Sequence, residues 1–98
     1  MKTIPVKILG YKRSQRYAIS RSLVPAQRTF EARHPDFQLD VQEVPTAQEM
    51  LQYTAVIAFP SLMIGEKLVC VGRFPSKEEI LEWLEDETRL PEGSHSAP

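Results

Sequence analysis

The segment Ala58–Leu84, which reads AFPSLMIGEKLVCVGRFPSKEEILEWL, decides the fold. It contains two apolar runs, Leu62–Ile64 and Lys67–Val71, separated by the pair Gly65-Glu66. A two-residue link whose first residue is glycine suits a type II′ turn, which joins two antiparallel strands. The segment therefore predicts an antiparallel hairpin.

The same segment ends in a predicted helix. Ser76 and Glu79 have the S-x-x-E spacing of a capping box, in which each side chain bonds the backbone amide of the other residue. Glu78 and Glu79 also suit the positive end of a helix dipole. An apolar stripe at helical spacing follows, so the hairpin leads into an amphipathic helix. The stripe consists of Ile80, Leu81 and Leu84.

The first third of the chain predicts a buried strand and a long helix. Thr3–Leu9 becomes continuously apolar toward its end, which is typical of a strand buried on both faces. We expect the helix to begin at Ser14 as N-cap, to be kinked at Pro25, and to end at His34-Pro35-Asp36. Its apolar face is formed by Ile19, Leu23, Ala26 and Phe30.

A second strand and a short helix come next. Apolar and polar residues alternate over residues 37–42, which is the period of an outer strand with one solvent-facing side. Thr46 and Glu49 form a second capping box. It opens a short helix that we expect to turn Met50 and Leu51 inward.

The predicted order is strand, helix, strand, helix, strand, strand, helix. A long helix between the first two strands predicts a parallel crossover, and the hairpin adds two antiparallel strands. This order predicts an α/β fold with a mixed four-stranded sheet. A chain of 98 residues fits one domain, which we place at residues 1–88. Residues 89–98 are polar and without periodicity, so we expect a disordered tail.

The composition argues against a membrane protein and a secreted protein. No window approaches the roughly 18 uninterrupted apolar residues of a membrane span, and the N-terminus lacks the apolar core of a signal peptide. The single cysteine, Cys70, allows no internal disulfide, which suits a reducing compartment. We therefore expect a cytoplasmic protein.

Charge is distributed unevenly along the chain. Up to His34 there are eight lysines and arginines against one acid, and from Pro35 onward there are four against twelve. This asymmetry raises the question of an anionic partner for the first half. The alternative is that the two halves neutralise each other, within one compact surface or through self-association.

In this order of elements the chain resembles the small, single-domain thioredoxin-like (thioredoxin/glutaredoxin-like) proteins of bacteria and archaea, over roughly residues 3–87. Members begin with a strand ending in a phrase such as V-L-G. Later they carry a proline entering the third strand, a short hairpin, and a phrase like G-R-x-P-S-x-E-E-I-x-x-W-L. The matching residues here are Ile8-Leu9-Gly10, Phe59-Pro60-Ser61-Leu62, Gly65 and Gly72–Leu84. The resemblance implies a three-layer thioredoxin-like fold.

The chain departs from that group at its reactive centre. Members carry C-x-x-C at the start of the first helix, where this chain has Tyr11 and Ser14 in one register or Arg13 and Arg16 in the other. Disulfide exchange needs an attacking thiolate and a second sulfur, and serine can replace neither. The sequence therefore argues against a dithiol oxidoreductase, and we expect no catalytic residue and no cofactor.

The single thiol and the two imidazoles of the sequence do not indicate a reactive site. Cys70 lies in an apolar strand without an adjacent cation or helix start, so we expect it to be buried. His34 and His95 have neither a cysteine–histidine spacing nor the spacing of metal ligands, and we expect no metal site.

The basic loop after the first strand and Pro60 supply the candidate binding site. The cations of this loop crowd a helix start that already carries positive charge, so they either extend into solvent or bind an anion together with helix amides. In the resembled fold the proline follows a cis peptide bond and faces this loop, where backbone can pair with an extended peptide. The candidate binding residues are Tyr11, Lys12, Arg13, Ser14, Arg16, Phe59 and Pro60.

Two functions remain open at this point. The first is a redox-inactive binding or adaptor domain whose partner is a protein or peptide, anionic in character. The second is a thiol-disulfide redox protein that works through Cys70 or with the thiols of a partner. Nucleic acid is the weaker option, because the basic half lacks a recognisable module or an aromatic stacking face.

Overall fold

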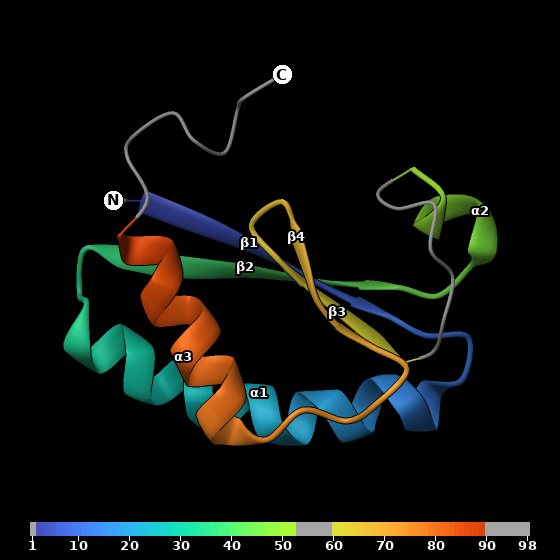
Figure 1. Ribbon diagram of the computed structural model, residues 1–98, viewed down its shortest axis with the longest axis horizontal. Coiled ribbons are helices and arrows are strands. Elements are labelled where there is room, and N and C mark those ends of the chain that lie inside the picture. The colour runs from blue at the N-terminus through green and yellow to red at the C-terminus, as the bar shows by residue number, and fades with distance from the viewer. Residues whose placement is uncertain (1, 53–59, 90–98) are drawn as a thin grey trace.

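The chain folds in the predicted order of strands and helices (Figure 1). The computed structural model describes residues 2–52 and 60–89. Phe59 and the predicted tail lie outside the described residues, except for Arg89, which follows the last helix. The elements are β1 (Lys2–Leu9), α1 (Arg13–Arg33), β2 (Phe37–Val44), α2 (Ala47–Met50), β3 (Ser61–Ile64), β4 (Lys67–Val71) and α3 (Lys77–Thr88).

The strands form one mixed sheet in the order β2-β1-β3-β4. β1 runs parallel to β2, and β3 runs antiparallel to both β1 and β4. The parallel pair follows from the long crossover through α1, and the antiparallel pair from the tight turn at Gly65-Glu66. The α/β class and the mixed four-stranded sheet are therefore confirmed.

Helices cover both faces of the sheet, which makes three layers. α1 and α3 lie side by side over one face, and α2 lies over the other (Figure 1). The larger core lies under α1 and α3 and includes Ile4, Val6, Ile8, Ile19, Leu23, Ala26, Phe30, Ile80 and Leu84. The smaller core lies under α2 and consists of Leu9, Val44, Met50 and Met63.

The hairpin turn requires glycine at its first position. Gly65 has a φ of 64°, whereas Glu66 has a negative φ, as a type II′ turn demands. A side chain at this position would also collide with Oε1 of Glu87 on α3. The turn predicted from the pair Gly65-Glu66 is therefore confirmed, and it is packed against the last helix.

Two local predictions are resolved by where the helices end. α1 continues through Pro25 and ends at Arg33, with the His34 amide donating to the Phe30 carbonyl at 2.9 Å. The prediction that Leu51 faces inward is wrong. α2 ends at Met50, which is fully buried. Leu51 lies beyond the end of the helix and is 57% exposed.

Candidate functional site

Three neighbouring strands reach the same end of the sheet beside the start of α1 (Figure 1). Leu9 pairs with Ser61, and Ser61 pairs with Val71, which sets β1, β3 and β4 in register. The parallel strands β1 and β2 also end here, and ligands of α/β proteins bind outside the carboxyl ends of parallel strands. The residues that follow or precede the paired positions are Gly10, Pro60 and Gly72.

The helix α1 begins at Arg13 with Lys12 as its N-cap, so the prediction of Ser14 as N-cap is wrong. The Lys12 amide donates to Oε1 of Gln15 at 3.3 Å, and the Lys12 carbonyl accepts from the amide of Gln15 at 3.0 Å. The Gln15 side chain thus makes one of the two hydrogen bonds of a capping box, the one to the N-cap amide. The other is missing, because the Lys12 side chain has no acceptor for the Gln15 amide. The first backbone amides of α1 therefore receive no hydrogen bond from the side chain of the N-cap residue.

Arg16 fixes the loop that precedes the helix. Its Nη1 donates to the carbonyl oxygens of Gly10 at 2.8 Å and Tyr11 at 3.0 Å, and its Nε donates to Oε1 of Glu43 at 2.8 Å. The Arg16 side chain is only 15% exposed. Its guanidinium is therefore committed to holding the loop against the end of β2, and Arg16 positions the site.

The residues on either side of the helix start are exposed. Lys12, Arg13 and Ser14 are exposed, and neither Lys12 nor Arg13 forms an ion pair within the described parts of the chain. Tyr11 is 52% exposed. The structure therefore brings two solvent-facing cations and one aromatic ring to the end of β1.

Pro60 precedes β3, whose first residue, Ser61, pairs with Leu9 at the end of β1. Pro60 is buried, and its carbonyl accepts a hydrogen bond from the Gly72 amide at 2.8 Å. Gly72 has a φ of 72°, which a side chain would disfavour. Phe59 and the peptide bond between Phe59 and Pro60 lie outside the described residues. Pro60 and Gly72 together close the β3–β4 side of the site.

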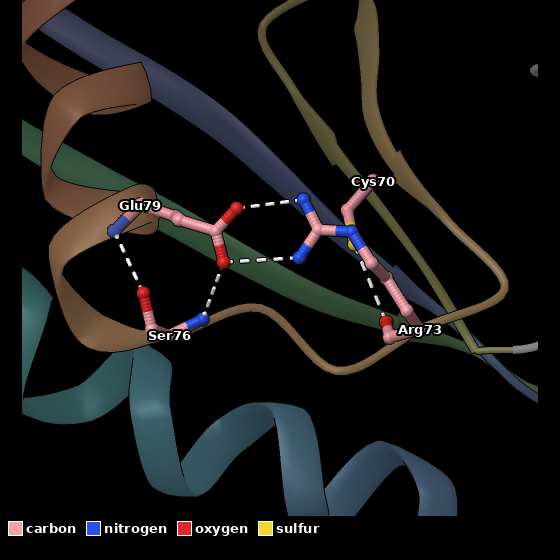
Figure 2. Close-up of polar contacts among 4 residues, drawn as sticks. All are labelled: Cys70, Arg73, Ser76 and Glu79. Carbon is pink, nitrogen blue, oxygen red and sulfur yellow. Dashed lines mark hydrogen bonds and ion pairs between the residues drawn. The ribbon is translucent and has the colours of Figure 1, made fainter.

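A polar corner joins β4 to α3 on the same side (Figure 2). Arg73 binds Glu79 in bidentate fashion, from Nη1 to Oε1 at 2.9 Å and from Nη2 to Oε2 at 2.6 Å. The Ser76 amide donates to Glu79 Oε1 at 3.0 Å, and the Glu79 amide donates to Ser76 Oγ at 3.1 Å. The predicted capping box is confirmed, and Arg73 clasps it from the preceding loop.

The hydrogen bond from Arg73, and then that from the Ser76 amide, lowers the pKa of Glu79 to about 2. The same hydrogen bond with Glu79 raises the pKa of Arg73. Sequence reasoning gave Arg73 no role. A basic residue three positions before the N-cap serine of an S-x-x-E box is the signal that could have indicated the clasp.

Cys70 lies at this corner with its thiol turned inward (Figure 2). The residue is 3% exposed, and its Sγ–H donates to the Arg73 carbonyl at 3.3 Å. Burial raises the pKa of the Cys70 thiol, and the positive charge of Arg73 offsets only part of that effect. The prediction of a buried cysteine is confirmed, and its thiolate is disfavoured.

A family model described as the thioredoxin domain matches residues 25–85, which is more than half of the chain. The chain belongs to the thioredoxin domain family. Comparisons with curated proteins and with solved structures find no match.

The thioredoxin domain match covers Pro60 and the whole corner from Cys70 to Glu79, and it begins after the basic loop. The matched part therefore includes the proline, the hairpin and the G-R-x-P-S-x-E-E-I-x-x-W-L phrase on which the resemblance was based. The 98 residues of this thioredoxin domain contain one cysteine, and it lies in β4. The loop from Tyr11 to Arg16 offers hydroxyl, amide and cationic groups at the end of β1.

Other chemistry has little support in the described residues. Across residues 2–52 and 60–89, no three side chains of histidine, cysteine, aspartate or glutamate lie together as metal ligands would. His34 instead bonds Glu85 of α3 and stacks near Phe30, at 4.8 Å between ring centroids. No helix in the described part of this thioredoxin domain is long and apolar enough to cross a membrane.

Proposed function

We propose that this thioredoxin domain is a binding or adaptor domain that is inactive in thiol redox chemistry. Its ligand would be an acidic peptide or protein segment, held between the Tyr11–Arg16 loop and the edge at Pro60. One observation carries the proposal. The single thiol of the 98 residues, that of Cys70, is buried in β4 and hydrogen-bonded to the Arg73 carbonyl, while the loop that follows β1 is basic.

Thiol–disulfide exchange needs two accessible sulfur groups, and the candidate site contains no cysteine. Exchange requires a thiolate that reaches the partner disulfide and a second sulfur that resolves the mixed intermediate. Cys70 is covered, its pKa is raised by burial, and no second cysteine occurs in the 98 residues. The alternative, in which Cys70 or the thiols of a partner carry redox chemistry, has less support for this reason.

Electrostatics favours an anionic ligand at the loop. Lys12 and Arg13 are exposed at the start of a 21-residue helix, the end that carries about half a positive charge from the aligned peptide dipoles. Arg16 holds the loop carbonyls away from an incoming anion by bonding them itself. A carboxylate would gain charge-assisted hydrogen bonds from Lys12, Arg13 and the first helix amides.

Apolar surface beside the loop suits the rest of a peptide. Tyr11, Val71 and Phe74 are 52%, 43% and 56% exposed, and each follows or ends a strand at this end of the sheet. The cis peptide bond that the family resemblance implies before Pro60 belongs to this proposal. An extended segment with acidic and apolar residues fits both features.

A titration followed by amide NMR spectra tests the binding. An acidic peptide of about ten residues with interspersed leucines is added to the protein, and the amides of residues 11–17 are expected to shift in a saturable manner. The double variant Lys12→Glu/Arg13→Glu should lose the response. The matched variant Lys2→Glu/Lys67→Glu, which changes charge equally on exposed strand residues, should keep it. Absence of shifts at millimolar peptide would refute the binding site.

A turnover assay tests the redox half of the proposal separately. With a dithiol reductant and a protein disulfide as substrate, turnover is expected at the uncatalysed rate, and Cys70→Ser should behave as the parent protein. Thiol-dependent turnover that disappears in Cys70→Ser would establish the redox alternative instead.

A further inference from the structure

α1 presents a basic face to solvent, on the side opposite its buried residues. Tyr17, Arg21, Val24 and Arg28 recur at steps of four, three and four residues, so they share one face of the helix. Tyr17 is 65% and Val24 is 42% exposed, and both arginines are exposed. Large apolar side chains between exposed cations are typical of a surface that contacts a partner.

α3 presents an acidic face beside it. Glu78 and Glu82 are exposed and lie one turn apart, opposite the buried Ile80 and Leu84. α1 carries arginines at 13, 16, 21, 28 and 33 with one acid, whereas α3 carries Lys77 and acids at 78, 79, 82, 85, 86 and 87. The layer of two helices is therefore positive on one side and negative on the other.

Within residues 2–52 and 60–89, the outward charges of these two helical faces form no ion pairs. α1 and α3 pack side by side through buried residues of the larger core. Among the ion pairs of the described residues, none includes Arg21, Arg28, Glu78 or Glu82. The neighbouring helices thus leave their opposite charges facing solvent.

We propose that this helical face, defined by Tyr17, Arg21, Val24, Arg28, Glu78 and Glu82, binds the same face of a second copy of the chain. A two-fold axis that runs between the two helices, in the plane of the face, lays α1 of each copy on α3 of the other. Each basic face then meets an acidic face, and every contact occurs twice. The bipolar layer is self-complementary in this arrangement.

A long polyanion fits the same face less well. Nucleic acid laid across the layer would meet the arginines of α1 and also Glu78 and Glu82 of α3, the helix packed against α1. Like charges brought together in a close interface repel and disfavour binding. A second copy avoids this repulsion, because its own α1 covers those acids.

The size of the face predicts a weak dimer. α1 is about 31 Å long, α3 is about 18 Å long and each helix is about 10 Å wide, so the two helices offer roughly 500 Å² per copy. Stable interfaces bury about 800 Å² per partner. We therefore expect association that is seen at high protein concentration and weakens with salt, as screening shortens the Debye length from about 30 Å at 0.01 M to about 3 Å at 1 M.

Sedimentation equilibrium over a concentration series tests this dimer. The parent protein should show a monomer–dimer equilibrium at low salt. The variants Arg21→Glu/Arg28→Glu and Glu78→Lys/Glu82→Lys should each weaken it by at least about a hundredfold, because each places like charges across the face. The two variants mixed in equal amounts should form a heterodimer, since the acidic α1 of one then meets the basic α3 of the other.

The rescue by mixing separates lost contacts from lost folding. The control Lys2→Glu/Lys67→Glu changes the net charge as much as the arginine reversal but lies on strands, and it should dimerise as the parent does. A parent protein that stays monomeric at millimolar concentration and low salt overturns the proposal. So does a dimer unaffected by both reversals, a mixture that fails to associate, or growth into open polymers.

Binding of a short DNA duplex that needs Arg21 and Arg28, without self-association, would also overturn it. The outcome is independent of the peptide site, because that site is tested with reversals at Lys12 and Arg13. Loss of one interaction leaves the other measurable.

Discussion

α3 begins behind Ser76, whose hydroxyl accepts a hydrogen bond from the Glu79 amide, and it has Glu78 and Glu79 in its first turn. α1 begins behind Lys12, whose side chain can accept none, and it has no acid in its first turn. The start of α3 follows every preference for a stable helix end, and the start of α1 follows few of them. The difference indicates that the start of α1 is shaped by something other than helix stability, and ligand binding is the function we propose for it.

The two helix starts also differ in how an arginine is used. Arg73 clasps a carboxylate of its own helix start, which closes that end to other anions. Arg16 bonds the loop carbonyls and Glu43 of β2, which fixes the loop and leaves Lys12 and Arg13 facing solvent. One corner is internally neutralised, and the other keeps positive charge available.

The largest expected effect comes from Arg16→Ala. Hydrogen bonds to charged groups contribute about 1.5–3 kcal/mol each, and this change removes bonds to two carbonyls and a carboxylate. We expect a loss of about 2 kcal/mol in the free energy of unfolding, measured with urea. Arg13→Ala is the matched control and should change stability by less than about 0.5 kcal/mol, because its side chain is exposed. Equal losses in both variants would contradict the positioning role of Arg16.

Ser76→Ala tests the cap of α3 against the uncapped start of α1. Removal of an N-cap hydroxyl costs about 1 kcal/mol, so the urea midpoint should fall. Ser14→Ala, at the start of α1, should cause no loss, since Ser14 is an exposed residue inside the helix and not its cap. A loss at Ser14 as large as that at Ser76 would remove the contrast between the two helix starts.

Lys12→Asp should reverse the balance between stability and binding at the start of α1. Aspartate is a favoured N-cap and suits the helix dipole, so we expect a gain of roughly 0.5–1 kcal/mol in the free energy of unfolding. The same variant should bind the acidic peptide more weakly in a calorimetric titration. Unchanged affinity together with increased stability would show that the basic N-cap has no part in ligand binding.

Acid should weaken the corner of α3 gradually. The folded pKa of Glu79, about 2, lies below its ordinary value of 4.5. Ionised Glu79 therefore contributes stability that is fully present above about pH 4.5 and is lost as the pH falls toward 2. The stability difference between the parent and Glu79→Gln, measured with urea at several pH values, should shrink across this window. A difference that stays constant from pH 6 to pH 2.5 would exclude the clasp as its source.

Local periodicity was sufficient to predict the elements and their order. Three of the patterns are local: the alternation in β2, the apolar face of α1, and the pair Gly65-Glu66. Each can be recognised without knowledge of the rest of the chain. The capping box at Ser76 belongs to the same class, because both of its hydrogen bonds join residues three positions apart. The long crossover and the tight hairpin predicted the parallel pair β1–β2 and the antiparallel pair β3–β4, whereas no pattern predicted that β3 would lie beside β1.

The site depended on contacts that periodicity does not encode. Arg16 meets Glu43 only after β1 and β2 have paired, so a residue predicted as a ligand-binding cation became a support for its loop. The predicted N-cap of α1 was Ser14, whereas the observed N-cap is Lys12, whose amide donates to the side chain of Gln15. Arg73 and Glu79 join across the loop between β4 and α3, and the spacing of Arg73 to the S-x-x-E box was the one local signal for this contact.

The reaction of Cys70 with an aromatic disulfide, compared in folded and urea-unfolded protein, tests the central claim most directly. A thiol that is buried, bonded to a carbonyl and raised in pKa should react at least about a hundredfold more slowly when folded, with no acceleration near neutral pH. A folded protein that reacts as fast as the unfolded chain would contradict the account, because it would place a usable thiolate on this domain.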